Sequence, residues 1–170
     1  MSLGEIWPRI GPDKSHEILS SIQKSNKKLY GTTVEVLAPR LKLRPAKILE
    51  MPKAERHARW MNLLAHPQYD PLTQNLLMEW LANHQTALMA HWLDRLGATH
   101  DGRGLLKDYP PCPDEAVLDA AWESLLQAHA PDEVLAYLSL FNAAPETRWP
   151  ALAARLATDP RLPLRPLASP

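Results

Sequence analysis

The chain has 170 residues, of which 45% are hydrophobic and 22% charged, and its 19 basic and 19 acidic residues give a formal net charge of zero. This balance is typical of an ordinary folded protein, and it argues against a disordered chain, a polybasic nucleic-acid coat or a surface built for anionic membranes. The single cysteine, Cys112, excludes an intrachain disulfide, and no stretch approaches the ~20 apolar residues that a bilayer-spanning helix needs.

The first predicted helix covers residues 14–29. Either Asp13 or Ser15 can cap its start, and Gly31 is expected to end it. Its inward face is predicted from apolar residues at helical spacing, namely Ile18, Leu19 and Ile22.

The next segment, residues 33–44, is open to two interpretations. Polar and apolar residues alternate in 33–37 and again in 40–44, as they do in a small β-hairpin. A lone two-stranded hairpin is marginally stable, so a helical hairpin is the favoured interpretation.

Residues 33–51 also resemble the helix–turn–helix pattern of DNA-binding proteins. The small Ala38 lets two helices cross closely, and Pro45 suits the first position of the second helix. Lys42 stands where the turn favours glycine, which departs from the pattern. Aliphatic residues are expected to bury the crossing, namely Leu37, Leu41, Leu43 and Ile48. The resemblance implies that Arg44 and Lys47 face the major groove or its phosphates and that Lys42 faces the DNA backbone.

Charge is unevenly distributed along the chain. Residues 1–60 contain 12 basic and six acidic residues, a net charge of +6, so residues 61–170 contain seven basic and 13 acidic residues, a net charge of −6. The favoured explanation is that the two regions attract each other within the fold. The alternative is that the basic region faces a polyanion or an acidic partner.

Prolines recur where the later helices are predicted to begin, because proline fits the first helical position. The longest predicted helix, about 71–96, follows Asp70 and Pro71, and Gly97 is expected to end it. Its length makes it the expected central helix of the fold. The other helices are predicted at 52–65, 114–129 and 131–142, and from Glu146 or Pro150 to about 157.

Two segments lack a helical pattern, a loop at 97–113 and a proline-rich tail at 159–170. The tail is expected to be extended. The loop contains three candidates for contact with a protein partner, namely Asp101, Arg103 and Tyr109.

The loop also contains the adjacent pair His100 and Asp101. This pair is similar to the metal-binding pair of HD-family phosphohydrolases, all-helical enzymes whose imidazoles and carboxylates hold a divalent cation that activates water. The resemblance implies a metal at His100 and Asp101, together with an upstream histidine and a downstream aspartate. The candidates are His66, His84 or His91, and Asp108, Asp119 or Asp132. A turn in which Asp101 accepts hydrogen bonds from its own backbone is the favoured explanation of the pair.

We therefore expect an all-α fold, a compact antiparallel bundle of six to seven helices. A single domain is expected over 1–170, with a basic third (1–60), an acidic helical part (61–158) and the proline-rich tail (159–170). The favoured function is a non-enzymatic protein–protein interaction or scaffold domain in the cytoplasm, without a cofactor or a membrane partner. A DNA-binding protein is the first alternative, and a metal-dependent phosphohydrolase is the second.

Overall fold

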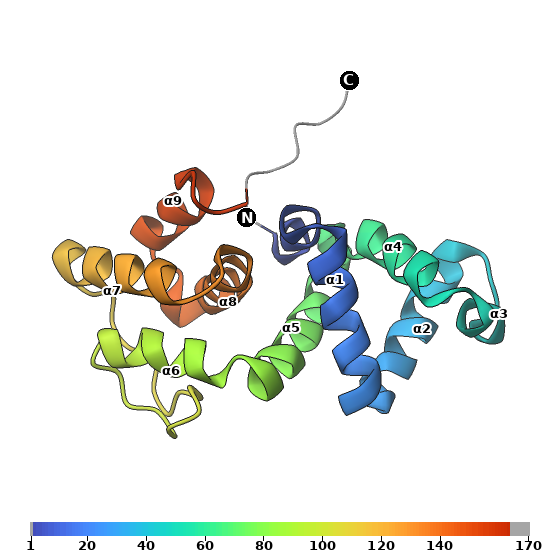
Figure 1. Ribbon diagram of the computed structural model, residues 1–170, viewed down its shortest axis with the longest axis horizontal. Helices are drawn as coiled ribbons and strands as arrows, with labels where there is room; N and C mark the ends of the chain where they lie inside the picture. The colour runs from blue at the N-terminus through green and yellow to red at the C-terminus, as the bar shows by residue number, and fades with distance from the viewer. Residues whose placement is uncertain (1, 164–170) are drawn as a thin grey trace. The chain divides into compact units, whose positions relative to one another are not determined.

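The computed structural model describes residues 2–163, which form two compact units divided between Trp80 and Leu81. This part of the chain contains nine α-helices, three short 3-10 helices and one isolated β-bridge between His100 and Leu106 (Figure 1). The predicted all-α bundle is confirmed, whereas the predicted number of six to seven helices is too low. The single domain expected over 1–170 stays a prediction.

Unit 1, residues 2–80, packs around α1, which contacts both α2 and α4. Four fully buried side chains of α1 and α4 form much of its core, namely Trp7, Ile18, Ile22 and Trp60. The division between the units falls inside α5. The elements are η1 (Leu3–Glu5), α1 (Ile6–Ser25), α2 (Lys27–Leu41), α3 (Pro45–Glu50), α4 (Lys53–Leu64), η2 (Pro67–Tyr69) and α5 (Asp70–His84).

The first helices differ from the predicted helix over 14–29. Helix α1 begins earlier and ends sooner, and it is kinked at Gly11, whose φ is 81°. Asn26 then caps α2, because its Oδ1 accepts a hydrogen bond from the Leu29 N–H at 2.9 Å. Gly31 consequently lies inside α2 and ends no helix.

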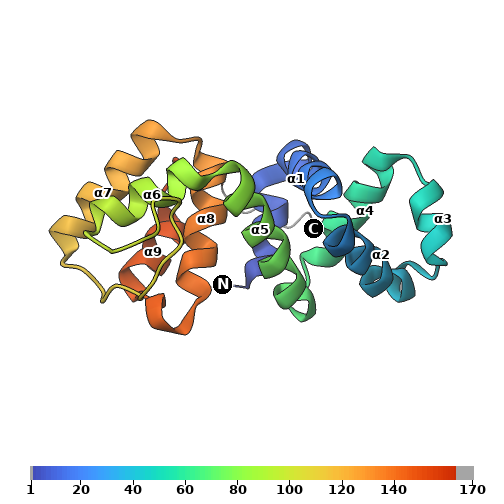
Figure 2. The ribbon, with the colours of Figure 1, turned by 90° about the horizontal axis from the view of Figure 1, so that it is seen from below.

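Unit 2, residues 81–163, contains the remaining helices, which pack beside one another (Figures 1 and 2). Phe141 lies edge-on between two indole rings, with centroids 6.0 Å from Trp92 and 5.3 Å from Trp149. The elements after α5 are α6 (Thr86–Arg95), α7 (Glu115–Ala128), α8 (Pro131–Ala143), η3 (Pro145–Thr147) and α9 (Pro150–Thr158). Pro131 and Pro150 begin helices as predicted.

The predicted long helix over 71–96 is wrong, because it is two helices, α5 and α6. Gln85 separates them with φ −126° and ψ 29°, which are not helical angles. The reason is visible in the spacing of the leucines, which skip from Leu81 to Leu88 and leave polar residues over one full turn. Gly97, with φ 66°, follows the end of α6 as expected.

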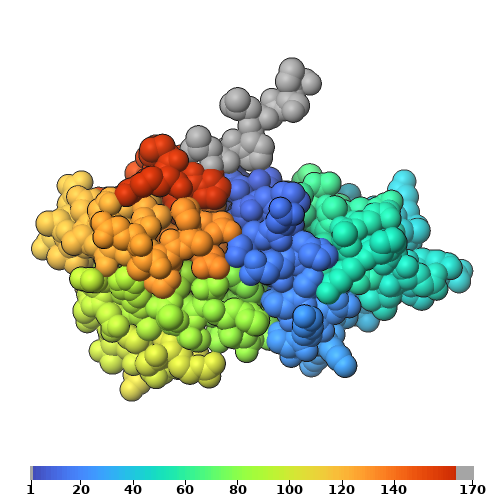
Figure 3. All heavy atoms as spheres, in the orientation of Figure 1, coloured from blue at the N-terminus to red at the C-terminus, as the bar shows by residue number. Residues whose placement is uncertain are grey.

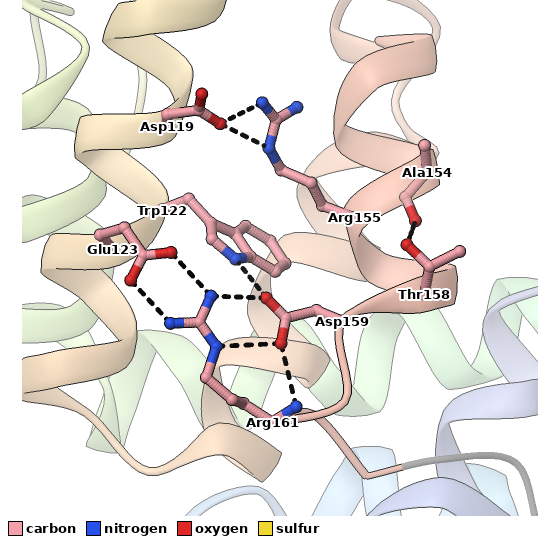
Figure 4. A network of polar contacts seen from close by, with 8 residues as sticks. All are labelled: Asp119, Trp122, Glu123, Ala154, Arg155, Thr158, Asp159 and Arg161. Carbon is pink, nitrogen blue, oxygen red and sulfur yellow. Dashed lines mark hydrogen bonds and ion pairs between the residues drawn. The ribbon is translucent and has the colours of Figure 1, made fainter.

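A polar network joins α7 to the segment after α9 (Figure 4). Arg161 donates to both carboxylate oxygens of Glu123 at 2.6 and 2.7 Å, and to Asp159 Oδ2 at 2.6 Å. The Trp122 indole N–H donates to the same Asp159 oxygen at 2.8 Å. The hydrogen bonds from Arg161 lower the pKa of Asp159, which keeps its carboxylate charged.

Acidic side chains of α7 are thus neutralised within unit 2. Arg155 of α9 pairs with Asp119, as Arg161 does with Glu123. The network fixes the start of the predicted proline-rich tail, where Leu162 is buried. The rest of the tail, from residue 164 onward, lies outside the described residues.

Candidate nucleic-acid interface

The segment 33–51 folds as two helices joined by a short turn, so the β-hairpin interpretation of 33–44 is wrong. Helix α2 continues to Leu41, and α3 begins at Pro45. Leu37 and Ile48 are fully buried and Ala38 nearly so, which packs α3 against the end of α2. Leu41 and Leu43, also expected to bury the crossing, are only half-buried, so the buried side of the predicted helix–turn–helix pattern is present in part.

The turn begins with a lysine in the left-handed conformation. Lys42 has φ 53° and ψ 34°, and it is the one non-glycine residue with positive φ in the described part of the chain. Its N–H donates to the carbonyls of Ala38 and Pro39, and the Leu43 N–H donates to Ala38 at 3.3 Å, which is a Schellman ending. A residue with a Cβ in this conformation costs about 1 kcal/mol relative to glycine. Lysine thus adopts the conformation for which the pattern prefers glycine.

The three predicted DNA-facing side chains, Lys42, Arg44 and Lys47, are exposed on this turn and α3. Lys47 pairs with Glu50, one turn further along α3, at 2.7 Å. Lys42 and Arg44 have no ion-pair partner among residues 2–163. Both ribbon views place α3 at the edge of unit 1, and its atoms lie at the surface in the space-filling view (Figures 1, 2 and 3).

A buried arginine, which the sequence analysis missed, holds α3 in place. Arg56 of α4 is 4% exposed. Its Nη1 donates to the carbonyl oxygens of Ile48, Leu49 and Met51 at 3.2, 2.8 and 3.4 Å. These carbonyls lie at the C-terminal end of α3, where a helix lacks donors and favours a cation.

The same arginine is part of a polar cluster formed by α1, α2 and α4. Arg56 Nε donates to the Tyr30 hydroxyl at 2.9 Å, and this hydroxyl lies 2.8 Å from His57 Nε2. His57 Nδ1 lies 3.1 Å from His16 Nδ1. Burial is the main cause that lowers the pKa of His57, to about 3, and the neighbouring His16, Arg56 and Lys53 lower it further. The ring of His57 is therefore neutral at physiological pH.

The predicted contact loop is organised by a turn at Asp101. The Asp101 Oδ1 accepts hydrogen bonds from the backbone N–H groups of Arg103 and Leu105, at 2.8 and 3.0 Å. These hydrogen bonds lower the pKa of Asp101, and the one from Leu105 has the largest effect. Arg103 donates to the Ala82 carbonyl, and Tyr109 is half exposed.

The structure does not bring the HD-type metal candidates together into a site. His100 Nε2 lies 3.0 Å from Asp94 Oδ1, and the Asp101 carboxylate serves the turn. Among residues 2–163, no three histidine, cysteine, aspartate or glutamate side chains are placed to hold a metal ion.

A second histidine pair lies in unit 2. His91 Nε2 lies 2.9 Å from Ser124 Oγ, and His91 Nδ1 lies 3.0 Å from His129 Nε2. A serine beside an imidazole is the geometry of an activated nucleophile. Ser124 lies inside α7, however, where the helix uses the neighbouring backbone N–H groups, so these are not free to act as oxyanion donors. We interpret the pair as a link between α6 and α7.

Comparisons with protein-family models, with curated proteins and with solved structures found no match to this chain. Over the described residues, no helix combines the length and the apolar character needed to cross a bilayer. The function is therefore argued from the geometry of the two units.

We expect Arg56→Leu to lower the unfolding free energy by about 2–4 kcal/mol, because the Tyr30 hydroxyl and the α3 carbonyls lose their buried charged donor. Arg59→Leu, on the same helix, removes an exposed ion pair with Glu55 and is expected to change this free energy by less than about 1 kcal/mol. Urea unfolding followed by circular dichroism measures both. Equal small changes in the two variants would contradict the role of Arg56.

The low pKa of His57 makes stability dependent on pH. The unfolded chain protonates this histidine near pH 6.5, whereas the folded chain does so only near pH 3. Between these values the unfolded state binds more protons, so the unfolding free energy falls as the pH is lowered, by up to about 1.4 kcal/mol per pH unit. Above this window the contribution is constant.

His57→Gln is expected to flatten this dependence, since glutamine offers an acceptor and a donor but does not titrate. Urea unfolding of both proteins between about pH 7 and pH 4 measures the two slopes. The same slope in both proteins would show that His57 is not held neutral in the fold.

Proposed function

We propose that unit 1 binds double-stranded DNA through the helix–turn–helix formed by α2 and α3. The observation that carries the proposal is the turn itself. It presents Lys42 and Arg44 to solvent, with no acid of the described chain neutralising either, while the following helix α3 is anchored by the buried Ile48.

The charge around the turn supports a polyanionic partner. Residues 36–49 contain four basic residues and no acidic one. Residues 1–80 as a whole contain 12 basic and eight acidic residues, a net charge of +4. A positive, exposed segment of this kind attracts nucleic acid before any specific contact forms.

The short α3 limits how much sequence the protein can read. Its six residues make fewer than two turns, so few side chains can reach base edges. Arg44 is the N-cap of α3 and Lys47 follows one turn later. In this proposal both approach the groove and its phosphates, and Lys42 approaches the DNA backbone. Phosphate contacts are therefore expected to supply most of the affinity.

A second candidate function is a protein–protein contact at the 97–113 loop. The exposed apolar side chains of Leu105 and Tyr109 favour it, because the turn at Asp101 holds the start of this loop in a defined shape. This contact does not involve α3, so a DNA assay with variants of the turn separates the two functions.

The variant with Lys42, Arg44 and Lys47 all changed to Ala tests DNA binding. We expect this variant no longer to shift the electrophoretic mobility of a random-sequence duplex at low salt. We also expect its slope of log affinity against log salt to be smaller in magnitude by about 2–3, since each phosphate contact contributes about 0.9.

The matched control changes Lys24, Lys27 and Lys28 to Ala, which removes the same charge from the same unit. This control is expected to retain most of the affinity. An equal loss in both variants would assign the binding to general charge, and no shift by the native protein at low salt would exclude the proposal.

We expect Lys42→Gly to raise the unfolding free energy by about 0.5–1 kcal/mol, because glycine adopts the left-handed conformation without strain. The same change is expected to weaken duplex binding, because it removes a phosphate contact. Lys42→Arg keeps the charge and serves as the control. Thermal unfolding and fluorescence anisotropy measure the two effects, and an unchanged duplex affinity of Lys42→Gly would show that Lys42 does not contact DNA.

A further inference from the structure

A cleft of about 420 Å³ opens between α1 and α4 in unit 1. This volume lies within the range of small-molecule sites. The lining of the cleft comes from mainly polar residues of α1 and mainly apolar residues of α4. Those of α1 are Pro12, Asp13, Ser15 and His16, and those of α4 are Ala54, His57, Ala58 and Met61. None of these residues belongs to the helix–turn–helix surface.

The polar cluster behind the cleft has a fixed direction, because an arginine can donate hydrogen bonds but cannot accept them. The Tyr30 oxygen therefore accepts from Arg56 Nε. Among the described residues, the hydroxyl proton of Tyr30 has one acceptor, His57 Nε2. Burial raises the pKa of Tyr30, which keeps this proton on the phenol.

This direction determines the tautomers of both histidines. Since His57 Nε2 accepts, the proton of its neutral ring is on Nδ1, and it donates to His16 Nδ1. A neutral His16 consequently carries its own proton on Nε2. Within the described part of the chain this N–H has no partner. His16 thus offers the cleft a hydrogen-bond donor whose tautomer is set by Arg56.

Asp13 supplies the complementary acceptor. It precedes His16 by three residues on α1, so both side chains lie on one face of the helix and both line the cleft. Over residues 2–163 its carboxylate forms no ion pair or hydrogen bond. Across the cleft, the methyl groups of Ala54 and Ala58 and the side chain of Met61 form an apolar wall.

We propose that the cleft binds a free α-amino acid with an unbranched apolar side chain. The ligand carboxylate accepts the His16 Nε2–H, the ammonium group donates to Asp13, and the side chain packs against Ala58 and Met61. The inference rests on the geometry of unit 1 alone and does not depend on DNA binding.

The charges around the cleft favour a ligand with both signs. A simple organic anion is repelled by Asp13. A simple cation is disfavoured by Lys53 and Arg56, whose charges act on His57 in the lining. A zwitterion satisfies the donor and the acceptor without adding net charge.

The test uses the full chain and three matched probes: L-norleucine, hexanoate, which lacks the ammonium group, and pentylamine, which lacks the carboxylate. Nitrogen-detected NMR of the histidine rings reports the tautomers, and the methyl resonances of Ala58 and Met61 report occupancy. We expect L-norleucine to bind at least about tenfold more tightly than either other probe. We also expect the Nε2–H form at His16 and the Nδ1–H form at His57.

Three variants assign the contacts. Asp13→Asn, an exposed change, is expected to reduce the affinity for L-norleucine to that for hexanoate. His16→Phe removes the donor and abolishes saturable binding, whereas His16→Gln keeps a donor and retains it. Glu17→Gln, on the same helix but outside the cleft lining, leaves the affinity unchanged.

Four results would overturn the proposal. They are the absence of a saturable shift with L-norleucine, equal affinity for hexanoate or pentylamine, an unchanged affinity in Asp13→Asn, and an Nδ1–H form at His16. Because Asp13 packs against no partner, its variant keeps the test decisive even if His16→Phe unfolds.

Discussion

The position of α3 depends on one buried guanidinium. A six-residue helix is far too short to persist by itself, since helix formation needs many more residues to offset the cost of nucleation. Ile48 anchors it by burial, and Arg56 anchors it by donating to the carbonyls at its end. Because the charge of Arg56 is itself buried, it needs the Tyr30 oxygen as well as these carbonyls. The helix and the arginine therefore require each other.

The two units treat their charges in opposite ways. In unit 2, carboxylates of α7 pair with Arg155 in α9 and with Arg161 just after it. The acidic excess of this unit is therefore partly neutralised within the unit. In unit 1, the turn between α2 and α3 concentrates basic residues where Lys42 and Arg44 find no acid. A neutral total thus conceals a local positive surface. This contrast is the reason to interpret the basic turn as a binding surface instead of as ordinary solvation.

Local sequence signals predicted most of the fold because they act over one helical turn. Prolines at first helical positions located α3, α8 and α9, and apolar periodicity located α4 and α7. The breaks at Asn26 and Gln85 were missed because neither uses glycine or proline. An asparagine cap and a skipped apolar turn interrupt a helix with much weaker signals.

The same distinction between local and long-range signals separates the two candidate sites. Lys42, Arg44 and Lys47 lie within six residues of one another, so a local pattern could identify them. The cluster of His16, Tyr30, Arg56 and His57 joins three helices, and His57 is 41 residues from His16. No spacing rule connects residues so distant, and a buried arginine looks like any surface arginine in the sequence. Only the packing of α1 against α4 brings the cluster together.

This cluster also connects the two surfaces of unit 1. Its hydrogen bonds run from the carbonyls of α3 through Arg56, Tyr30 and His57 to the ring of His16 in the cleft. With the tautomers inferred above, a group that accepts from His16 extends this chain of hydrogen bonds. If both proposed ligands bind, thermodynamic linkage requires that the factor by which the amino acid changes duplex affinity equals the factor by which the duplex changes amino-acid affinity. A factor different from one would show that the cleft and the duplex-binding surface are energetically coupled.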